Sequence, residues 1–481
     1  MKPPVAVSLG TLLKVKMRIP YFLARRPPIA SVGVSLFASA LLLGSCNKEA
    51  EDTGEPPEVT WADDVAPILY RSCMGCHLGE SVWDMDGIGH FPLETYTDAE
   101  AVSIYIQQVA LSQRMPPWPG GASCDGRPTF LDDPSLSESD RLTILEWTEA
   151  DLAMGDVNNA PEIPAEIDPS LEGQTHTLFP AEDTQPSFAE DGYPCFLLDP
   201  ELDTDHWMTG FQGIPDNRPL VSSMMAWLVP PERVTEIKDL ANGEQSFRCF
   251  GLEPAEGLEL LGSWSPGAAP FETPTGSGIP MPAGSQVLLR THHHVWQGDA
   301  VQPDRSGIGL RLSDTAPEKE AHLYAIGNAE SGPELVQQNG ESSATFLVGT
   351  DKPHWEEMRF SPTPEQADGE IWAVGGWMHH SGVKLDLEVA GPEGSQCLLA
   401  MDNWRSDWMR LYRYDPSQGL PTWDSQSALT VRCSYENSIH NEDLMAALDE
   451  LGQSTPAPMG IGQSGTDEAC LSFIGILKPA P

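Results

Sequence analysis

The chain has 481 residues, a formal net charge of −44, and 40% hydrophobic against 20% charged residues. This composition is typical of a globular protein with about two to four domains and excludes a mainly disordered chain. The negative field excludes nucleic acid as a partner and repels anionic membrane surfaces, while 44 Pro and 43 Gly favour short strands and loops over long helices.

The first 46 residues have the features of an export signal. Basic residues up to Arg25 and Arg26 precede an apolar run that is too short to span a membrane comfortably. The run closes on small residues and Cys46, which resembles a bacterial lipobox; this implies a lipidated Cys46 as the mature N-terminus, with an uncleaved anchor as the alternative. We therefore expect a lipid-anchored protein of the bacterial cell envelope, periplasmic or at the outer-membrane surface, with the lipid anchor as its only membrane contact.

An acidic tether over 47–58 leads into a region, 59–155, that has a helical pattern. Apolar residues recur at helical spacing in three segments around the sequence CMGCH. We expect a cap at Thr97 for the second segment and a capping box of Ser137 and Asp140 for the third. A proline-rich linker over 156–170 then follows.

Beyond about residue 165 the helical periodicity fades and short strands are predicted. The segments are rich in β-branched residues or alternate in polarity, and Gly, Pro, Asp or Asn bound them. They include SQVLLRTHHHVW, IGLRLS, EIWAVGGWMHH, VKLDLEVAG and ALTVRCSY. Their spacing indicates antiparallel β-sandwiches, two of them in this length of chain.

The sequence CMGCH at 73–77 indicates covalent attachment of haem. Two thiols three positions apart, Cys73 and Cys76, can reach the two vinyl groups of the porphyrin, and the adjacent His77 can ligate the iron. A zinc knuckle would need a second CxxC or Cys/His pair, which this sequence lacks. A thioredoxin-like redox pair would normally follow a strand and has no need of His77. We therefore predict haem c.

The distal iron ligand is expected to be Met115, because a thioether in that position raises the reduction potential and Pro116-Pro117 fix the backbone beside it. The setting resembles that of small cytochromes c, in which the distal methionine commonly precedes two prolines. Three alternatives stay open: Met115 only packs, Met85 or His90 is the ligand, or the distal position is vacant.

The remaining residues resemble the copper type II, ascorbate-dependent monooxygenases, the family of peptidylglycine α-hydroxylating monooxygenase and dopamine β-monooxygenase. The resemblance runs from about YPCFLLD to TDEACLSFIGI and rests on LLGSWSPGAAPFETPTGSGIPMPAGSQVLLRTHHH, DRSGIGLRL, MHHSGVKLDLEV, VRCSYENS and TDEAC. It implies two jelly-roll-like sandwiches, each with one copper, and hydroxylation of a substrate C–H bond. A haem c domain joined to this module resembles a known bacterial arrangement.

Only two of the six copper ligands that the resemblance implies match this sequence. The implied ligand positions fall on Ser222-Ser223 for an adjacent histidine pair, His292 for a single histidine, Trp377-Met378-His379 for His-x-His, and Ala469 for methionine. A strand would place His292 and His294 on one face with His293 opposite, so a rebuilt copper site of His292 and His294, with His379, is physically feasible. Solvated histidines that bind no metal are the alternative.

Nine cysteines are present, and six are left after Cys46, Cys73 and Cys76. An even number fits disulfides in an oxidising compartment. The resemblance implies the pairs Cys195–Cys249 and Cys433–Cys470. Cys124 and Cys397 then form either a cross-domain bridge or free thiols.

The fold expected from these features is multidomain, with a small all-α cytochrome c domain followed by two all-β antiparallel, jelly-roll-like sandwiches. The expected boundaries are 1–46 for the lipoprotein signal peptide, 47–58 for the tether, 59–155 for the cytochrome c domain, 156–170 for the linker, 171–316 for the first monooxygenase-like sandwich and 317–481 for the second.

The leading functional hypothesis is an envelope oxidoreductase in which haem passes electrons to a copper monooxygenase-like module that hydroxylates an unidentified small molecule or peptide. A redox partner protein or a small reductant would supply the electrons. The second hypothesis is a pseudoenzyme, a disulfide-stabilised binding module with haem as a plain electron carrier, which Ser222, Ser223, Trp377 and Ala469 favour. A purely structural lipoprotein is the third, and it requires that no haem be bound.

Overall fold

The computed structural model describes residues 59–78, 91–116, 118, 124, 126–164, 170–185, 193–218, 220–249, 257–293, 302–328, 347–350, 353–392, 394–406, 408–460, 462 and 467–480. The expected signal peptide with Cys46, the tether, Met85, His90 and His294 lie outside these residues. Residues Pro57–Pro481 form one compact unit.

The described helices are short. They are η1 (Trp61–Val65), α1 (Ala66–Ser72), α2 (Tyr96–Ala101), α3 (Ser103–Leu111), α4 (Glu138–Glu149), η2 (Pro231–Arg233), α5 (Val234–Leu240), η4 (Pro416–Gln418) and α6 (Glu442–Glu450). The capping box of Ser137 and Asp140 is confirmed at the start of α4. The cap expected at Thr97 is wrong, because Thr95 and Asp98 form a capping box two residues earlier. None of the described helices is long and apolar enough to cross a membrane.

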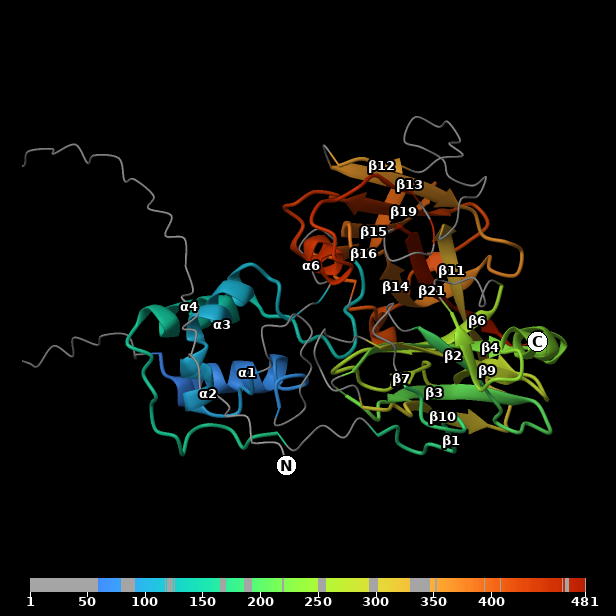
Figure 1. The fold of residues 1–481 in the computed structure, drawn as a ribbon, viewed down its shortest axis with the longest axis horizontal. Coiled ribbons are helices and arrows are strands. Elements are labelled where there is room, and N and C mark those ends of the chain that lie inside the picture. The colour runs from blue at the N-terminus through green and yellow to red at the C-terminus, as the bar shows by residue number, and fades with distance from the viewer. Residues whose placement is uncertain are drawn as a thin grey trace, which may run out of the picture. The chain divides into compact units, whose positions relative to one another are not determined.

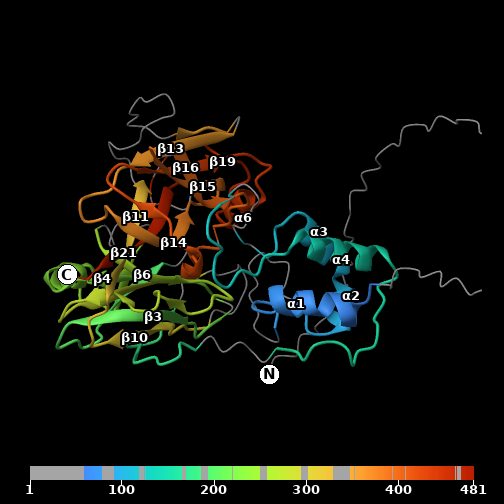
Figure 2. The ribbon, with the colours of Figure 1, turned by 180° about the vertical axis from the view of Figure 1, so that it is seen from behind.

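Helices α1 to α4 group together (Figures 1 and 2) around a small apolar cluster of their own. Its buried members include Trp61, Leu69, Ile144 and Trp147. The Trp147 indole N–H donates to the carbonyl of Ala153 at 3.1 Å, so the ring is both buried and hydrogen-bonded. This cluster holds α1 in place, and α1 leads directly into the CMGCH sequence.

Strands make up most of the secondary structure. They are β1 (His176–Leu178), β2 (Pro194–Leu198), β3 (His206–Ile214), β4 (Val221–Val229), β5 (Ser246–Arg248), β6 (Glu259–Trp264), β7 (Phe271–Glu272), β8 (Ser277–Met281), β9 (Gln286–His293), β10 (Gly307–Ser313), β11 (Lys319–Asn328), β12 (Leu347–Val348), β13 (His354–Phe360), β14 (Gly369–Trp377), β15 (Gly382–Gly391), β16 (Gly394–Met401), β17 (Leu411–Arg413), β18 (Thr422–Trp423), β19 (Ala428–Tyr435), β20 (Met459–Gly460) and β21 (Cys470–Pro479). The strands expected from SQVLLRTHHHVW, IGLRLS, EIWAVGGWMHH, VKLDLEVAG and ALTVRCSY are confirmed as β9, β10, β14, β15 and β19.

One ten-stranded sheet runs through both β-rich halves of the described chain. Its order is β1-β10-β3-β8-β11-β21-β14-β17, with β7 paired to β3 and β18 paired to β14. The two halves meet where β8 and β11 pair in parallel, Lys319 beside Ser277 and Glu320 beside Gly278. A five-stranded sheet, β5-β2-β9-β4-β6, and a four-stranded sheet, β13-β19-β15-β16, complete the layers, and one continuous apolar core includes residues of all three.

The expected fold class, a small all-α domain followed by two β-sandwiches, is wrong. The described chain is mostly β, and residues Pro57–Pro481 form a single compact unit without a separate all-α domain. The reason lies in the segment between α3 and α4. Phe130 forms a β-bridge with Tyr414, the Leu131 N–H donates to the Arg413 carbonyl at 2.8 Å, and a disulfide joins Cys124 to Cys397. These bonds make part of the expected helical region an edge of the β structure.

Three disulfides join six of the eight described cysteines, which confirms the expectation of disulfide bonds. Two are Cys195–Cys249 and Cys433–Cys470, the pairs that the family resemblance implies. The third, Cys124–Cys397, is the cross-domain alternative for the two cysteines left open by the sequence. Disulfides of this number indicate an oxidising compartment outside the cytoplasm.

Candidate functional site

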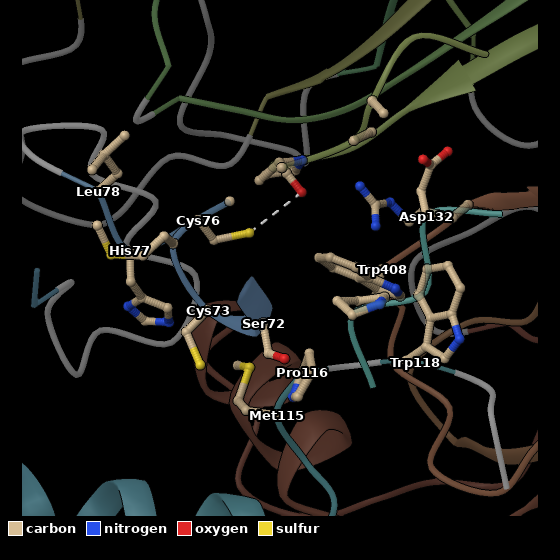
Figure 3. A pocket seen from close by; sticks show the side chains of 18 of the residues that line it. Ser72, Cys73, Cys76, His77, Leu78, Met115, Pro116, Trp118, Asp132 and Trp408 are labelled. Atoms are coloured by element: carbon tan, nitrogen blue, oxygen red, sulfur yellow. Dashed lines mark hydrogen bonds between the residues drawn. The ribbon is translucent and has the colours of Figure 1, made fainter. Parts of the chain in front are cut away.

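A cavity of about 700 Å³ lies at the end of α1 and is lined by Cys73, Cys76, His77 and Met115. Figure 3 shows these four side chains with Trp118 and Trp408, which line the same cavity. The volume falls in the range of about 300–1,000 Å³ that is usual for cofactor sites. The four residues expected to hold a haem therefore surround one space.

The two thiols of the CMGCH sequence are unpaired, whereas the six other described cysteines form disulfides. Burial raises the pKa of Cys73 to about 12, and burial also raises the pKa of Cys76. Both groups are therefore neutral thiols at pH 7. Both thiols line the same cavity as His77, as covalent attachment of haem requires.

His77 is oriented by a hydrogen bond to the backbone. Its Nδ1 lies 3.0 Å from the carbonyl oxygen of Phe91, and because a carbonyl only accepts, Nδ1 must carry the proton. The imidazole also stacks on the Phe91 ring, with the centroids 6.2 Å apart. Burial lowers the pKa of His77, against the opposing effect of the Phe91 hydrogen bond, so the ring is neutral at pH 7. Its Nε2 then carries the lone pair that an iron ligand requires.

Met115 follows α3, where its backbone N–H bonds to the carbonyl of Val109 at 3.3 Å. Its thioether lines the same cavity as Cys73 and His77 (Figure 3). Pro116 lines the cavity beside it. The placement agrees with a distal ligand role, and the rival candidates Met85 and His90 lie outside the described residues.

The opposite wall of the cavity comes from the β-rich part of the chain. The Cys76 thiol lies 3.7 Å from the carbonyl oxygen of Pro266, in the turn after β6 (Figure 3). Gly267 in that turn has a φ of +69°, and a Cβ there would lie 2.4 Å from the Cys76 sulfur. Only glycine fits so close an approach at such a φ. The turn therefore closes the cavity directly over the second thiol.

The arginines and aromatic residues of this wall were not predicted from the sequence. Segment 404–413, which precedes and includes β17, supplies Arg405, Arg410, Arg413, Trp408 and Tyr412, the turn after β3 supplies Arg218, and the end of β6 supplies Trp264. A signal was present, since segment 404–413 reads WRSDWMRLYR in a chain with only 27 Lys and Arg against 71 Asp and Glu.

At the first candidate copper position, His292 is hydrogen-bonded to a serine. His292 lies opposite Ser223 in the pairing of β9 with β4, and its Nδ1 lies 2.7 Å from the Ser222 hydroxyl. The ring stacks on Tyr193, with the centroids 4.2 Å apart and the planes 5° apart. Ser222 and Ser223 thus occupy the place at which the resemblance implies a histidine pair, and hydroxyls do not ligate copper(I).

The second candidate copper position has His379, with Trp377 and Ala469 where the resemblance implies a histidine and a methionine. His379 follows β14, and its Nδ1 lies 2.7 Å from the carbonyl oxygen of Asp467, close in sequence to Ala469. The His379 N–H donates to the carboxylate of Glu468 at 2.9 Å, and burial raises the pKa of this glutamate. Trp377 is buried beneath the guanidinium of Arg290, which lies 4.6 Å from the ring centroid.

Within the described residues, no three His, Cys, Asp or Glu side chains come together as a metal site. Hydroxyl, indole and methyl groups at Ser222, Trp377 and Ala469 do not fit copper. By contrast, two unpaired thiols, an oriented neutral imidazole and a thioether around an apolar cavity fit a covalently bound haem.

No protein-family profile and no curated protein sequence matches the chain. Among solved structures, the major capsid protein P2 from bacteriophage PM2 is 9% identical, with a TM-score of 0.25 over 63% of this chain and 97% of that chain. Allantoicase is 9% identical, with a TM-score of 0.16 over 53% of this chain and 81% of that chain. A Paenibacillus xanthan lyase is 10% identical, with a TM-score of 0.18 over 67% of this chain and 28% of that chain. Likenesses this low carry no inference about fold or function.

Proposed function

We propose that this chain is a haem c electron-transfer protein of the bacterial cell envelope. The observation that supports it most is that Cys73, Cys76, His77 and Met115 line one cavity, although Met115 is separated from the CMGCH sequence by two helices. When bound, haem supplies a one-electron Fe(III)/Fe(II) couple. Electrons would come from a redox partner protein or a small reductant.

Each residue of the set has a distinct role in this proposal. Cys73 and Cys76 would each add a thiol across a vinyl group of the haem; the thiol hydrogen would end on the vinyl carbon, so no oxidant would be required. His77 holds its proton on Nδ1 through the Phe91 carbonyl and presents Nε2 as the proximal ligand. Met115 would supply the distal thioether.

In this proposal, the β-rich part encloses the haem and acts as a binding module, and it does not activate oxygen. Ser222 bonds to His292, and neither Trp377 nor Ala469 can ligate a metal, so we derive no step through copper. Hydroxylation by a monooxygenase-like module stays a prediction of the family resemblance. These contacts favour the pseudoenzyme hypothesis, in which the module keeps the fold of the monooxygenase family without its copper ligands.

The location in the envelope is part of the proposal. The disulfides require an oxidising compartment, which is also where haem c proteins are matured in bacteria. Lipidation at Cys46 would hold the chain at the membrane through its lipid alone.

The test is covalent haem on the full chain, produced in a host that attaches haem c. We expect haem to stay with the polypeptide on a denaturing gel, and the mass of the chain to rise by one haem. The double variant Cys73→Ser/Cys76→Ser should lose this haem. A matched control, Cys124→Ser/Cys397→Ser, also removes two cysteines and should keep it. Wild-type chain without covalent haem would refute the proposal.

A further inference from the structure

Positive charge gathers on the wall of the haem cavity although the chain as a whole is strongly acidic. Acidic residues outnumber Lys and Arg by 71 to 27. Five described arginines nevertheless line the cavity, namely Arg71, Arg218, Arg405, Arg410 and Arg413. Among the described residues that line it, the acidic ones are Asp132 and Asp133. An uneven distribution of this kind indicates that the cavity receives an anion.

Two of these arginines are already neutralised. Arg71 pairs with Asp140 at 2.9 Å, and Arg413 pairs with Asp132 at 2.6 Å. The Arg413 guanidinium also donates to the carbonyl of Glu272 at 3.2 Å. These ion pairs link α1 to α4 and link β17 to the segment that contains Asp132.

Arg410 is different, because its guanidinium bonds to no carboxylate among the described residues. It lies over the ring of Trp408, with its central carbon 4.4 Å from the ring centroid. Burial lowers the pKa of Arg410, and the nearby Cys76, Tyr412 and Asp132 partly offset this effect. A buried guanidinium without a direct carboxylate partner costs free energy, and a carboxylate bound at hydrogen-bond distance would offset that cost.

The segment that carries Arg410 is held rigidly. The Trp404 indole donates to the carbonyl of His379 at 3.1 Å, and the Trp404 backbone N–H donates to Val383 at 3.0 Å. Arg405 is buried at 7% exposure, and its carbonyl accepts from the Trp408 N–H at 3.2 Å. These hydrogen bonds hold the backbone around Arg405 in place independently of any ligand.

We propose that Arg410 binds a propionate carboxylate of the porphyrin, so that the β-rich part supplies an anion-binding residue of the haem site. This inference rests on the proposed function. Thioether bonds at Cys73 and Cys76 would hold the vinyl groups of the porphyrin, which leaves the propionate carboxylates for other residues that line the cavity. The planar fork of a guanidinium matches a carboxylate in two hydrogen bonds.

The arrangement has a consequence for the reduction potential. Oxidised haem carries one more positive charge than reduced haem, so a nearby guanidinium disfavours the oxidised form. Removal of the charge at Arg410 should lower the midpoint potential. The expected effect is a roughly tenfold change in the ratio of oxidised to reduced protein at a fixed solution potential, about 59 mV for a one-electron couple.

The test uses the full haem-loaded chain and spectroelectrochemical titration of Arg410→Gln. The matched control is Arg432→Gln, which makes the same change of charge at a residue of β19 that pairs with Glu357 and does not line the cavity. Arg410→Lys keeps the charge and should keep most of the potential. Because Arg410→Gln can fail to fold, Arg218→Gln in the turn after β3 serves as a second variant with the same expected direction.

A lowered potential in either cavity variant, and none in the control, supports the proposal. An unchanged potential in the folded, haem-loaded cavity variants would overturn it while leaving the haem assignment intact. Wild-type chain that carries no haem would instead refute the proposed function, so the two failures are distinguishable.

Discussion

At the scale of single residues, the haem proposal depends on which nitrogen of His77 can face iron. The carbonyl of Phe91 accepts a hydrogen bond from the Nδ1–H of His77, and the Phe91 ring stacks on the imidazole. Burial of the ring lowers its pKa and keeps it neutral at pH 7. These contacts prepare a proximal ligand before any cofactor binds, which is the usual way in which outer partners position a ligating histidine.

Met115 provides the first test at this scale. Met115→Ala should lower the midpoint potential of the haem-loaded chain, since a thioether ligand raises it. Met115→His should also lower it, because imidazole replaces sulfur. Met154→Ala is the control, as Met154 is 45% exposed and lies outside the cavity lining. The same potential and the same spectrum in wild type and Met115→Ala would show that Met115 only packs.

Asp304 provides a pH-dependent test. Burial raises its pKa, but hydrogen bonds and charge from His293, with help from Ser306 and Asn217, outweigh burial and hold the pKa below its usual value. A depressed folded-state pKa stabilises the fold above the unfolded value of about 3.9, and this contribution is lost as the pH falls through the folded-state pKa.

Asp304→Asn should therefore lower the free energy of unfolding by about 3 kcal/mol at pH 7, since it breaks a buried pair 2.9 Å apart. Urea unfolding at pH 7 and near pH 3 measures the effect, and the gap to wild type should shrink at the lower pH. The exposed Asp314→Asn is the control. A gap that is equally large at both pH values would contradict the assignment of the charge to Asp304.

The residues of the haem site differ in how far the sequence predicts them. Cys73, Cys76 and His77 lie within five residues, so their spacing alone predicts haem attachment. Arg410 lies more than 300 positions away, and only the pairing of strands brings it to the same cavity. No local pattern in the sequence predicts that Arg410 and His77 line the same cavity.

At the scale of elements, the segment between α3 and α4 decides how the helices relate to the strands. It pairs with Tyr414 through Phe130 and is tied by Cys124 to Cys397. Phe130 also stacks on the Tyr414 ring, with the centroids 5.1 Å apart. The segment thus supports both the aromatic wall of the cavity and the approach to Met115.

Removing the Cys124–Cys397 disulfide tests this connection. Cys124→Ser/Cys397→Ser should lower the free energy of unfolding by about 2–4 kcal/mol, because the bond closes a loop over a sequence separation of 273. Urea unfolding of the oxidised protein measures the change. Wild type under reducing conditions that open the same bond should behave like the variant. Equal stability of the variant and oxidised wild type would mean that the other contacts of this segment suffice.

Individual strands were predictable because alternation and turn residues are local signals, as β9, β10, β14, β15 and β19 illustrate. The capping box of α4 was predictable for the same reason. The start of α2 was not, because Thr95 and Thr97 both resemble caps and only the bond to Asp98 selects Thr95. Competing local signals of equal strength need tertiary structure to decide between them.

At the scale of the whole molecule, the ten-stranded sheet contradicts the picture of independent domains. The parallel pairing of β8 with β11 joins strands from the two β-rich halves, and one apolar core extends across both. Such pairings depend on contacts between residues that are distant in sequence, so hydrophobic periodicity cannot predict them. A haem bound in the cavity after α1 would therefore lie next to residues of both β-rich halves.

A single purified sample can test whether the chain binds haem and whether it binds copper. The full chain should be purified from a host that attaches haem c, with copper supplied in the medium, and its absorption spectrum and its iron and copper content measured together. We expect a Soret band, one iron per chain and no stoichiometric copper. A colourless protein without iron, or one that contains copper and no haem, would contradict the account.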